Sequence, residues 1–301
     1  MNIKEFKIHQ ALVTLDLSDI DDKVLEYINF LNKEIKIGSL YFLHVIKKAG
    51  FFSNLFFKDS SSLQSQFILN EDIIKHFIDG VESKLDKASY INVEYDVKEG
   101  QPLNVIVDGI EEHHADLTIV GKKPLGESSG VLGKSIARRS PSSVLFVPKE
   151  AAHQFKTIVV PIDFSENSGK ALQTALAINN MRQKPAKIVC LHVYEMPDLA
   201  LYSINKNHDQ LKSIIEADMH DAFDQFLDNY IPDLKDIVEI SLTERTSFST
   251  AGHLNDAVKE LEADFIIIGA KGHTPVERLL LGSVTEKFLQ INETIPTLIV
   301  R

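Results

Sequence analysis

Short apolar runs alternate along the chain with longer polar stretches in which apolar residues recur at helical spacing. The run TIVVPI (157–162) is followed by such a stretch around 171–176 and then by the run KIVCLHV (187–193). This alternation predicts βαβ units. The runs are continuously apolar, as in FIIIGA (265–270), which is typical of parallel strands covered on both faces. We therefore predict an α/β fold built from doubly wound parallel sheets.

The chain also repeats itself at an offset of about 148 residues. The segment 11–28 aligns with 158–175, and ADLTIVG (115–121) aligns with ADFIIIG (263–269). Segments that recur in the same order at a nearly constant offset indicate two copies of one structural unit. We expect five parallel strands in each copy.

Each copy closes on a short apolar run, 142–147 in the first and 296–301 in the second. The copies meet near residue 151, so we predict two domains, 1–151 and 152–301. A terminal strand that nothing covers would leave an exposed apolar edge, and such edges invite pairing. We therefore expect the two closing strands to pair with each other and to make the chain an internal pseudo-dimer.

Composition narrows the possible environment and partners. The formal net charge is −11, which disfavours sequence-independent binding to nucleic acid or to an anionic membrane. Cys190 is the one cysteine, so neither an internal disulfide nor a cysteine zinc site can form. No apolar run approaches the ~20 residues that span a bilayer, and the first ten residues lack the apolar segment of a signal peptide. We expect a cytoplasmic protein.

The segment 269–289 carries the strongest indication of a binding site. It reads G-x2-G-x9-G-S, with Gly269, Gly272 and Gly282 followed by Ser283. Gly269 ends a predicted strand, where open α/β sheets bind their ligands, and a helix is predicted to start after Gly282. Main chain without side chains and the N–H groups of a helix start suit a phosphate. Glycines alone often only make turns, so the placement of these glycines carries the prediction.

The chain resembles the universal stress proteins in their tandem two-domain form. The resemblance rests on VVPIDFSENS (159–168), LHV (191–193), ADFIIIGAKG (263–272) and LLLGSVTE (279–286). It implies an adenine nucleotide alpha hydrolase-like fold with ATP as the ligand, alone or with Mg²⁺ or Mn²⁺. It assigns the adenine and ribose contacts to Pro161, Ile162, Asp163, Val193, Gly269 and Ala270. It assigns the phosphate contacts to Gly272, Gly282, Ser283, Val284 and Thr285.

Three side chains beside the motif allow both a structural and a functional interpretation. The carboxylate of Asp163 follows a predicted strand and could accept hydrogen bonds from ribose hydroxyls, or it could cap the next helix. His44 and His192 end corresponding apolar runs of the two copies. We expect these histidines to pack and hydrogen-bond beside the site, and we assign no catalytic role to either.

The first copy departs from the motif in GKKPLGESSGVLGKSIARR (121–139). Pro124 stands where the second glycine is expected and has no N–H to donate, and Lys134 replaces the serine after Gly133. We therefore predict little or no ATP binding by the first copy, which would serve as a structural partner or bind something else. Its basic cluster is more simply interpreted as a solvated face: Lys122, Lys123, Lys134, Arg138 and Arg139.

These observations favour a nucleotide-responsive stress factor that binds ATP in its C-terminal half. A slow metal-dependent ATPase or phosphotransferase is the alternative, but no Walker lysine and no base beside a γ-phosphate can be identified. A scaffold that binds proteins and no nucleotide is a further alternative. The helix-spaced Glu216, His220 and Asp224 could bind zinc, although a solvated helix face is favoured. Pairing of two pseudo-dimers into a homodimer stays open.

Overall fold

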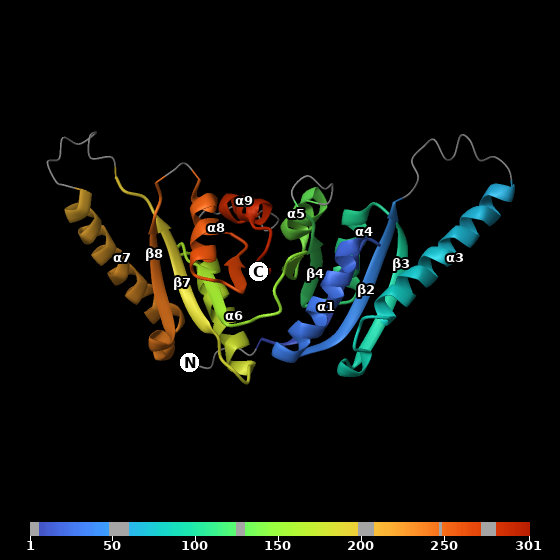
Figure 1. Ribbon diagram of the computed structural model, residues 1–301, viewed down its shortest axis with the longest axis horizontal. Helices are drawn as coiled ribbons and strands as arrows, with labels where there is room; N and C mark the ends of the chain where they lie inside the picture. The colour runs from blue at the N-terminus through green and yellow to red at the C-terminus, as the bar shows by residue number, and fades with distance from the viewer. Residues whose placement is uncertain (1–5, 48–59, 125–129, 198–207, 247–248, 272–280) are drawn as a thin grey trace. The chain divides into compact units, whose positions relative to one another are not determined.

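The computed structural model describes residues 6–47, 60–124, 130–197, 208–246, 249–271 and 281–301, with residues 47 and 60–70 described by their backbone alone. Residues Lys7–His153 form one compact unit, and residues Gln154–Arg301 form most of a second. Each unit contains its own parallel sheet with helices packed against it (Figure 1).

The described part of the first unit alternates strands with helices. Its strands are β1 (Ile8–Leu15), β2 (Ile37–Lys47), β3 (Asn92–Gly100), β4 (Leu117–Lys122) and β5 (Ser143–Pro148). Its helices are α1 (Asp19–Glu34), α3 (Ser60–Glu82), α4 (Pro102–Glu112) and α5 (Gly130–Arg139), with the short 3₁₀ helix η1 (Lys87–Ser89) before β3.

The described part of the second unit follows the same plan. Its strands are β6 (Thr157–Pro161), β7 (Lys187–Tyr194), β8 (Val238–Glu244), β9 (Phe265–Gly269) and β10 (Thr297–Val300). Its helices are α6 (Glu166–Met181), α7 (His208–Tyr230), α8 (Thr250–Glu260) and α9 (Ser283–Ile291), with the 3₁₀ helix η3 (Pro232–Ile237) before β8.

The two sheets have the same strand order, β3-β2-β1-β4-β5 in the first unit and β8-β7-β6-β9-β10 in the second. Every neighbouring pair within each unit's sheet is parallel. The predicted fold class, two tandem doubly wound domains with five-stranded parallel sheets, is therefore confirmed. The chain direction across the sheet reverses between β1 and β4 and between β6 and β9, and α/β sheets bind ligands at such switch points.

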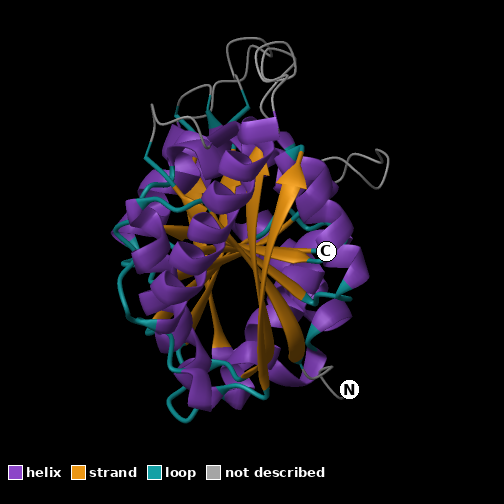
Figure 2. Cartoon of the chain, turned by 90° about the vertical axis from the view of Figure 1, so that its right-hand side faces the viewer, coloured by secondary structure: helices purple, strands orange, loops and turns teal. Residues whose placement is uncertain are grey.

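Helices cover the strands in both units, and Figure 2 shows strands running between helices. In the second unit α6 packs against β6, β9 and β10, whereas α8 packs against β7 and against α9. In the first unit α1 packs against β4 and β5, and α4 packs against β1, β2 and α5. All five residues of β9 are buried, which explains why its sequence FIIIG is apolar without alternation.

Corresponding residues of the two units make the same local hydrogen bonds. Oδ2 of Asp116 accepts two N–H groups near the start of β1, at 2.7 and 3.1 Å. Oδ2 of Asp264 accepts two N–H groups near the start of β6, at 2.7 and 3.0 Å. The turn after the first strand of each unit places Leu17 (φ 60°) and Phe164 (φ 62°) in the same left-handed conformation. The sequence repeat is thus a repeat of backbone geometry.

The single cysteine, Cys190, is buried in β7. Burial raises the pKa of its thiol to about 12, so the reactive thiolate form is disfavoured at neutral pH. Among the described residues, no helix combines the length and the apolar character that crossing a membrane requires.

Candidate functional site

A cavity of about 270 Å³ lies at the switch point of the second unit's sheet. Its wall is formed by the carboxyl ends of β6, β7 and β9 and by the first residues of α8 and α9. Nine of the eleven residues predicted to contact the ligand line this cavity: Pro161, Ile162, Asp163, Val193, Gly269, Gly282, Ser283, Val284 and Thr285. Their role as ligand contacts stays a prediction.

Two of the predicted residues stand apart from this wall. Ala270 is buried and does not line the cavity. Its main chain connects two neighbouring segments. Its N–H donates to the carbonyl of Val300 at 3.0 Å, and its carbonyl accepts the N–H of Gly282 at 2.8 Å. Gly272 lies outside the described residues.

The start of α9 forms one side of the cavity. Gly282 is the N-cap residue and has no side chain to accept a hydrogen bond, and its own N–H is already donated to Ala270. The hydroxyl of Thr285 is buried and donates to the carbonyl of Gly269 at 3.2 Å. The first N–H groups of a helix have no partner within that helix. The main-chain donors on this side of the cavity are therefore those of Ser283, Val284 and Thr285.

The turn between β6 and α6 holds Asp163 at the cavity. Oδ1 of Asp163 accepts the hydroxyl of Ser165 at 2.6 Å and its N–H at 3.1 Å. Ser165 is the N-cap of α6, and its Oγ accepts the N–H of Ser168 at 3.3 Å. The interpretation of Asp163 as the helix cap is therefore wrong, because the residue two positions later caps the helix. Asp163 orients the capping residue, and its side chain lies on the cavity wall.

His192 links the ends of β6 and β7 beside Asp163. Its Nδ1 lies 2.7 Å from the carbonyl oxygen of Ile162. Because a carbonyl only accepts, Nδ1 carries the proton in the neutral ring and Nε2 carries a lone pair. Burial lowers the pKa of His192, which keeps the ring neutral. The expected packing and hydrogen bonding are confirmed, including a contact with the Phe164 ring at 4.8 Å between centroids.

Gly269 has a packing role that its place in the motif did not indicate. A Cβ atom at this position would lie 2.8 Å from the backbone carbon and oxygen of Asn167, in the first turn of α6. No heavy-atom contact of that kind is tolerated without a shift of the backbone. The glycine therefore lets the start of α6 approach the end of β9, which brings Asp163 and Gly269 to the same cavity.

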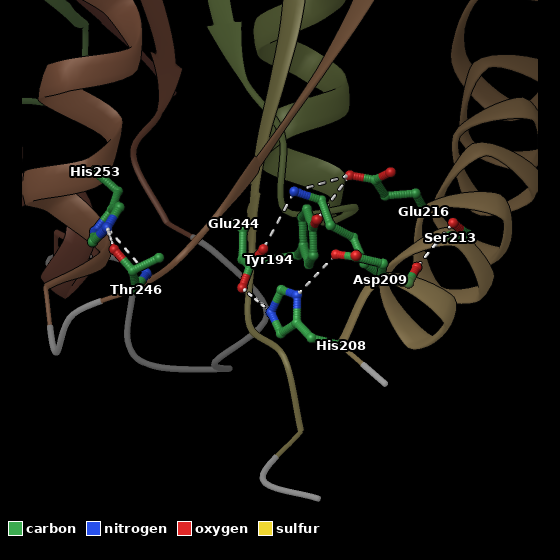
Figure 3. Close-up of polar contacts among 9 residues, drawn as sticks. Tyr194, His208, Asp209, Ser213, Glu216, Glu244, Thr246 and His253 are labelled. Carbon is green, nitrogen blue, oxygen red and sulfur yellow. Dashed lines mark hydrogen bonds and ion pairs between the residues drawn. The ribbon is translucent and has the colours of Figure 1, made fainter. Parts of the chain in front are cut away.

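A polar network joins β7, β8 and α7 on the flank of the second unit (Figure 3). The hydroxyl of Tyr194 donates to Oε1 of Glu216 at 2.9 Å, and Glu244 lies 3.0 Å from Nε2 of His208 and 3.4 Å from Nζ of Lys212. Burial, together with the hydrogen bond to Glu216, raises the pKa of Tyr194. Tyr194 follows Val193 in β7, so this network anchors the strand end that borders the cavity. Within the described residues, no group of three metal-ligating side chains is placed to hold a metal ion.

His253 holds the connection between β8 and α8 (Figure 3). Its Nε2 accepts the N–H of Thr246 at 3.1 Å, and its Nδ1 lies 3.2 Å from the carbonyl oxygen of Ser249. Two residues of α8, Thr250 and Leu254, line the cavity. The sequence analysis missed this wall because the sequence of α8 has the pattern of an ordinary amphipathic helix.

The start of α5 in the first unit differs from the start of α9. Helix α5 begins at Gly130, so Lys134 lies one turn inside the helix and its N–H is expected to donate within it. The hydroxyl of Ser135 is also used within the helix, since it donates to the carbonyl of Val131 at 2.9 Å. The expectation of a solvated face is wrong for Lys123. Its side chain is 17% exposed, and its Nζ lies 2.8 Å from Asp16.

Comparisons with known proteins agree with this architecture. The model of the universal stress protein family matches residues 7–148 and again residues 154–301. A universal stress protein of Methanocaldococcus jannaschii is 24% identical over 164 residues, covering 49% of this chain and 95% of that protein. A second protein of the family from that organism is 24% identical over 148 residues, covering 49% of this chain and 82% of its own length. The crystal structure of a universal stress protein from Archaeoglobus fulgidus matches with a TM-score of 0.66 at 18% identity, over 98% of this chain and 99% of that one.

Proposed function

Because the chain belongs to the universal stress protein family, we propose that its C-terminal domain binds ATP and that the protein acts as a nucleotide-responsive stress factor. The observation that carries this proposal is the cavity between the ends of β6 and β9, with the start of α9 on its wall. Main-chain N–H groups at a helix start, with the positive end of the helix dipole, favour a phosphate group.

The residues present fit an adenine nucleotide. The carboxylate of Asp163 supplies acceptors suited to ribose hydroxyls, and the main chain of Val193 supplies polar groups at the apolar part of the wall. The N–H groups of Ser283, Val284 and Thr285 would hold the phosphates. Residues from 151 onward include 14 basic and 21 acidic residues, so bound Mg²⁺ or Mn²⁺ would offset the repulsion of a polyphosphate.

The direct test adds negative charge where the phosphates are expected. Ser283→Asp with Val284→Asp alters two exposed positions in the first turn of α9. Acidic residues stabilise a helix start, so the fold should be retained while phosphate is repelled. We expect ATP affinity, measured by isothermal titration calorimetry, to fall by at least about tenfold, or 1.4 kcal/mol.

The first unit offers a matched control for that variant. Gly130→Asp with Val131→Asp places the same two charges in the first turn of α5, where both residues are also exposed. This control should bind ATP like the unmodified chain. Equal affinity in all three proteins would show that the phosphates do not lie at α9.

The same variants separate the alternatives. A slow ATPase or phosphotransferase would release ADP in the presence of Mg²⁺ or Mn²⁺, and the α9 variant would abolish this release while the α5 variant would not. A scaffold without nucleotide binding would give no heat of ATP binding in any of the three proteins.

We also propose that the two domains, 1–151 and 152–301, form an internal pseudo-dimer through β5 and β10. Each of these strands is the last strand of its own unit's sheet and is apolar after its first residue, Ser143 or Thr297. An apolar edge of this kind favours pairing with a second edge.

A further inference from the structure

The first unit has a cavity at the position that the predicted nucleotide site takes in the second unit. It lies at the ends of β1, β2 and β4, beside α4 and α5, and its volume is about 460 Å³, against about 270 Å³ in the second unit. Ten of its 18 lining residues are Ile, Leu or Val, compared with six of 16 in the second unit. Cavities of ~300 to 1,000 Å³ with mostly apolar walls are typical of small-molecule sites. The first cavity is thus larger and more aliphatic than its counterpart.

Three exposed apolar residues lie next in sequence to residues of this wall. Leu17, Ile74 and Val131 are 38%, 39% and 71% exposed, and they rank among the exposed large hydrophobic residues of the described chain. Each is the sequence neighbour of a residue that lines the cavity: Asp16, Ile73 and Leu132. An apolar rim formed by these side chains would suit a ligand with an extended apolar part.

The polar groups of the wall differ from those of the second unit in one decisive position. Asp21 stands where the second unit has Ser168, and Oδ2 of Asp21 accepts the N–H of Leu17 at 2.7 Å. Asp16, the counterpart of Asp163, pairs with Lys123 at 2.8 Å. The charged residues on this wall are therefore two carboxylates and one ammonium group. Burial and the charge of Asp16 raise the pKa of Asp21 to about 7.

Two further polar side chains of this wall have a known orientation, and the hydroxyl of Thr14 donates to the carbonyl of Ile119 at 3.5 Å. Nδ1 of His44 lies 2.9 Å from the carbonyl oxygen of Leu15, so Nδ1 is the donor, and in the neutral ring Nε2 carries a lone pair that can accept. His44 lines the cavity together with Asp16 and Asp21. This wall therefore favours a ligand that donates hydrogen bonds and carries positive charge, and it disfavours a phosphate or carboxylate.

We propose that the N-terminal domain binds an amphiphile that combines an aliphatic chain with a protonated amine. The chain would fill the space between the Ile, Leu and Val side chains of α4, α5 and the strand ends. The ammonium group would lie at Asp16 and Asp21. Its charge would balance the carboxylate of Asp21, because Lys123 already pairs with Asp16. This site does not depend on ATP binding by the C-terminal domain.

The first experiment compares ligands of matched chain length on the unmodified full-length protein. Octylammonium and octanoate are titrated by calorimetry in the presence of excess ATP, so that the C-terminal cavity is occupied if it binds nucleotide. We expect octylammonium to bind at one site, at least about tenfold tighter than octanoate, which is 1.4 kcal/mol. Because burying each methylene contributes ~0.8 kcal/mol, hexylammonium should bind roughly tenfold more weakly than octylammonium. Absence of octylammonium binding, or an equal affinity for octanoate, would overturn the proposal.

A pair of variants tests whether the charge in the cavity is responsible. Asp21→Ser installs the residue that the second unit has at this position, and it should reduce octylammonium affinity about tenfold. Asp22→Ser removes the same charge from the exposed neighbour, whose partner is Lys84 at 2.5 Å, and it should leave the affinity unchanged. Equal loss in both variants would indicate long-range attraction rather than a site and would refute the assignment. If Asp21→Ser does not fold, the comparison of octylammonium with octanoate decides alone.

Discussion

Leu17 and Phe164 share a left-handed backbone conformation but differ in their surroundings. Leu17 is exposed, whereas the ring of Phe164 packs against His192, Phe223 and Phe226. The left-handed conformation costs a non-glycine residue roughly 1 to 2 kcal/mol, and glycine adopts it without that cost. We expect Leu17→Gly to leave the free energy of unfolding unchanged or to raise it by up to about 1 kcal/mol in urea titrations.

Phe164→Gly removes the same backbone strain and should nevertheless destabilise the second unit by about 2 to 4 kcal/mol, because aromatic packing is lost. If both variants changed stability equally, the contrast between an exposed and a packed turn residue would be wrong.

His192 should stay neutral to a lower pH than an ordinary histidine. Burial lowers its pKa from the ordinary value of 6.5, so its stabilising contribution is present above pH 6.5 and is lost as the pH falls through the lowered pKa. Nitrogen chemical shifts of the ring should show the Nδ1–H tautomer at neutral pH and titration below 6.5. A titration at or above 6.5, or the Nε2–H tautomer, would contradict the hydrogen bond to Ile162.

At the scale of single residues, the sequence could place Asp163 at a strand end but could not decide what it contacts. Aspartate and serine are both good helix caps, and the sequence IDFSENS offers both. The choice of Ser165 follows from the turn at Phe164, whose positive φ is not evident from a phenylalanine in the sequence.

Elements meet closely only where a glycine permits it. Gly269→Ala places a methyl group 2.8 Å from the backbone of Asn167, and we expect it to lower the free energy of unfolding by about 1 to 3 kcal/mol. Gly80→Ala is the matched change, because nothing lies within 4 Å of a Cβ there and Gly80 is inside α3. That variant should stabilise by up to about 1 kcal/mol. A Gly269→Ala protein as stable as the unmodified chain in urea would show that α6 has room to move.

The buried strands could be predicted, because continuously apolar runs such as FIIIG mark buried parallel strands. The outer strands β3 and β8 carry polar residues along their length, NVEYDVKEG and VEISLTE, and no apolar run marks them. The helix starts were harder to predict. The aligned glycines Gly133 and Gly282 suggest the same helix start, yet α5 begins at Gly130 and α9 at Ser283. That difference of about one turn decides which N–H groups reach a cavity, and nothing in the residues VLGKS sets it unambiguously. The cavity wall on α8 depends on how His253 holds the preceding connection, which is a tertiary effect.

For the whole molecule, the proposed pairing of β5 with β10 predicts a specific pattern of amide exchange. A strand with a neighbour on one side only protects alternate amides, whereas a strand with neighbours on both sides protects consecutive ones. We expect consecutive protection of the amides from Ser143 to Val147 and from Thr297 to Val300 in hydrogen exchange followed by nuclear magnetic resonance. Alternating protection in both strands would mean that the pseudo-dimer does not form through these edges.

The two domains share one fold, and we propose that they bind different ligands. Isothermal titration of the full-length chain with ATP and Mg²⁺ tests this most directly, because it counts sites. We predict one ATP per chain, with the site lost when Ser283 and Val284 become aspartate and kept when Gly130 and Val131 do. Two ATP molecules per chain, or one that survives the change at α9, would contradict the assignment of the nucleotide to the C-terminal domain.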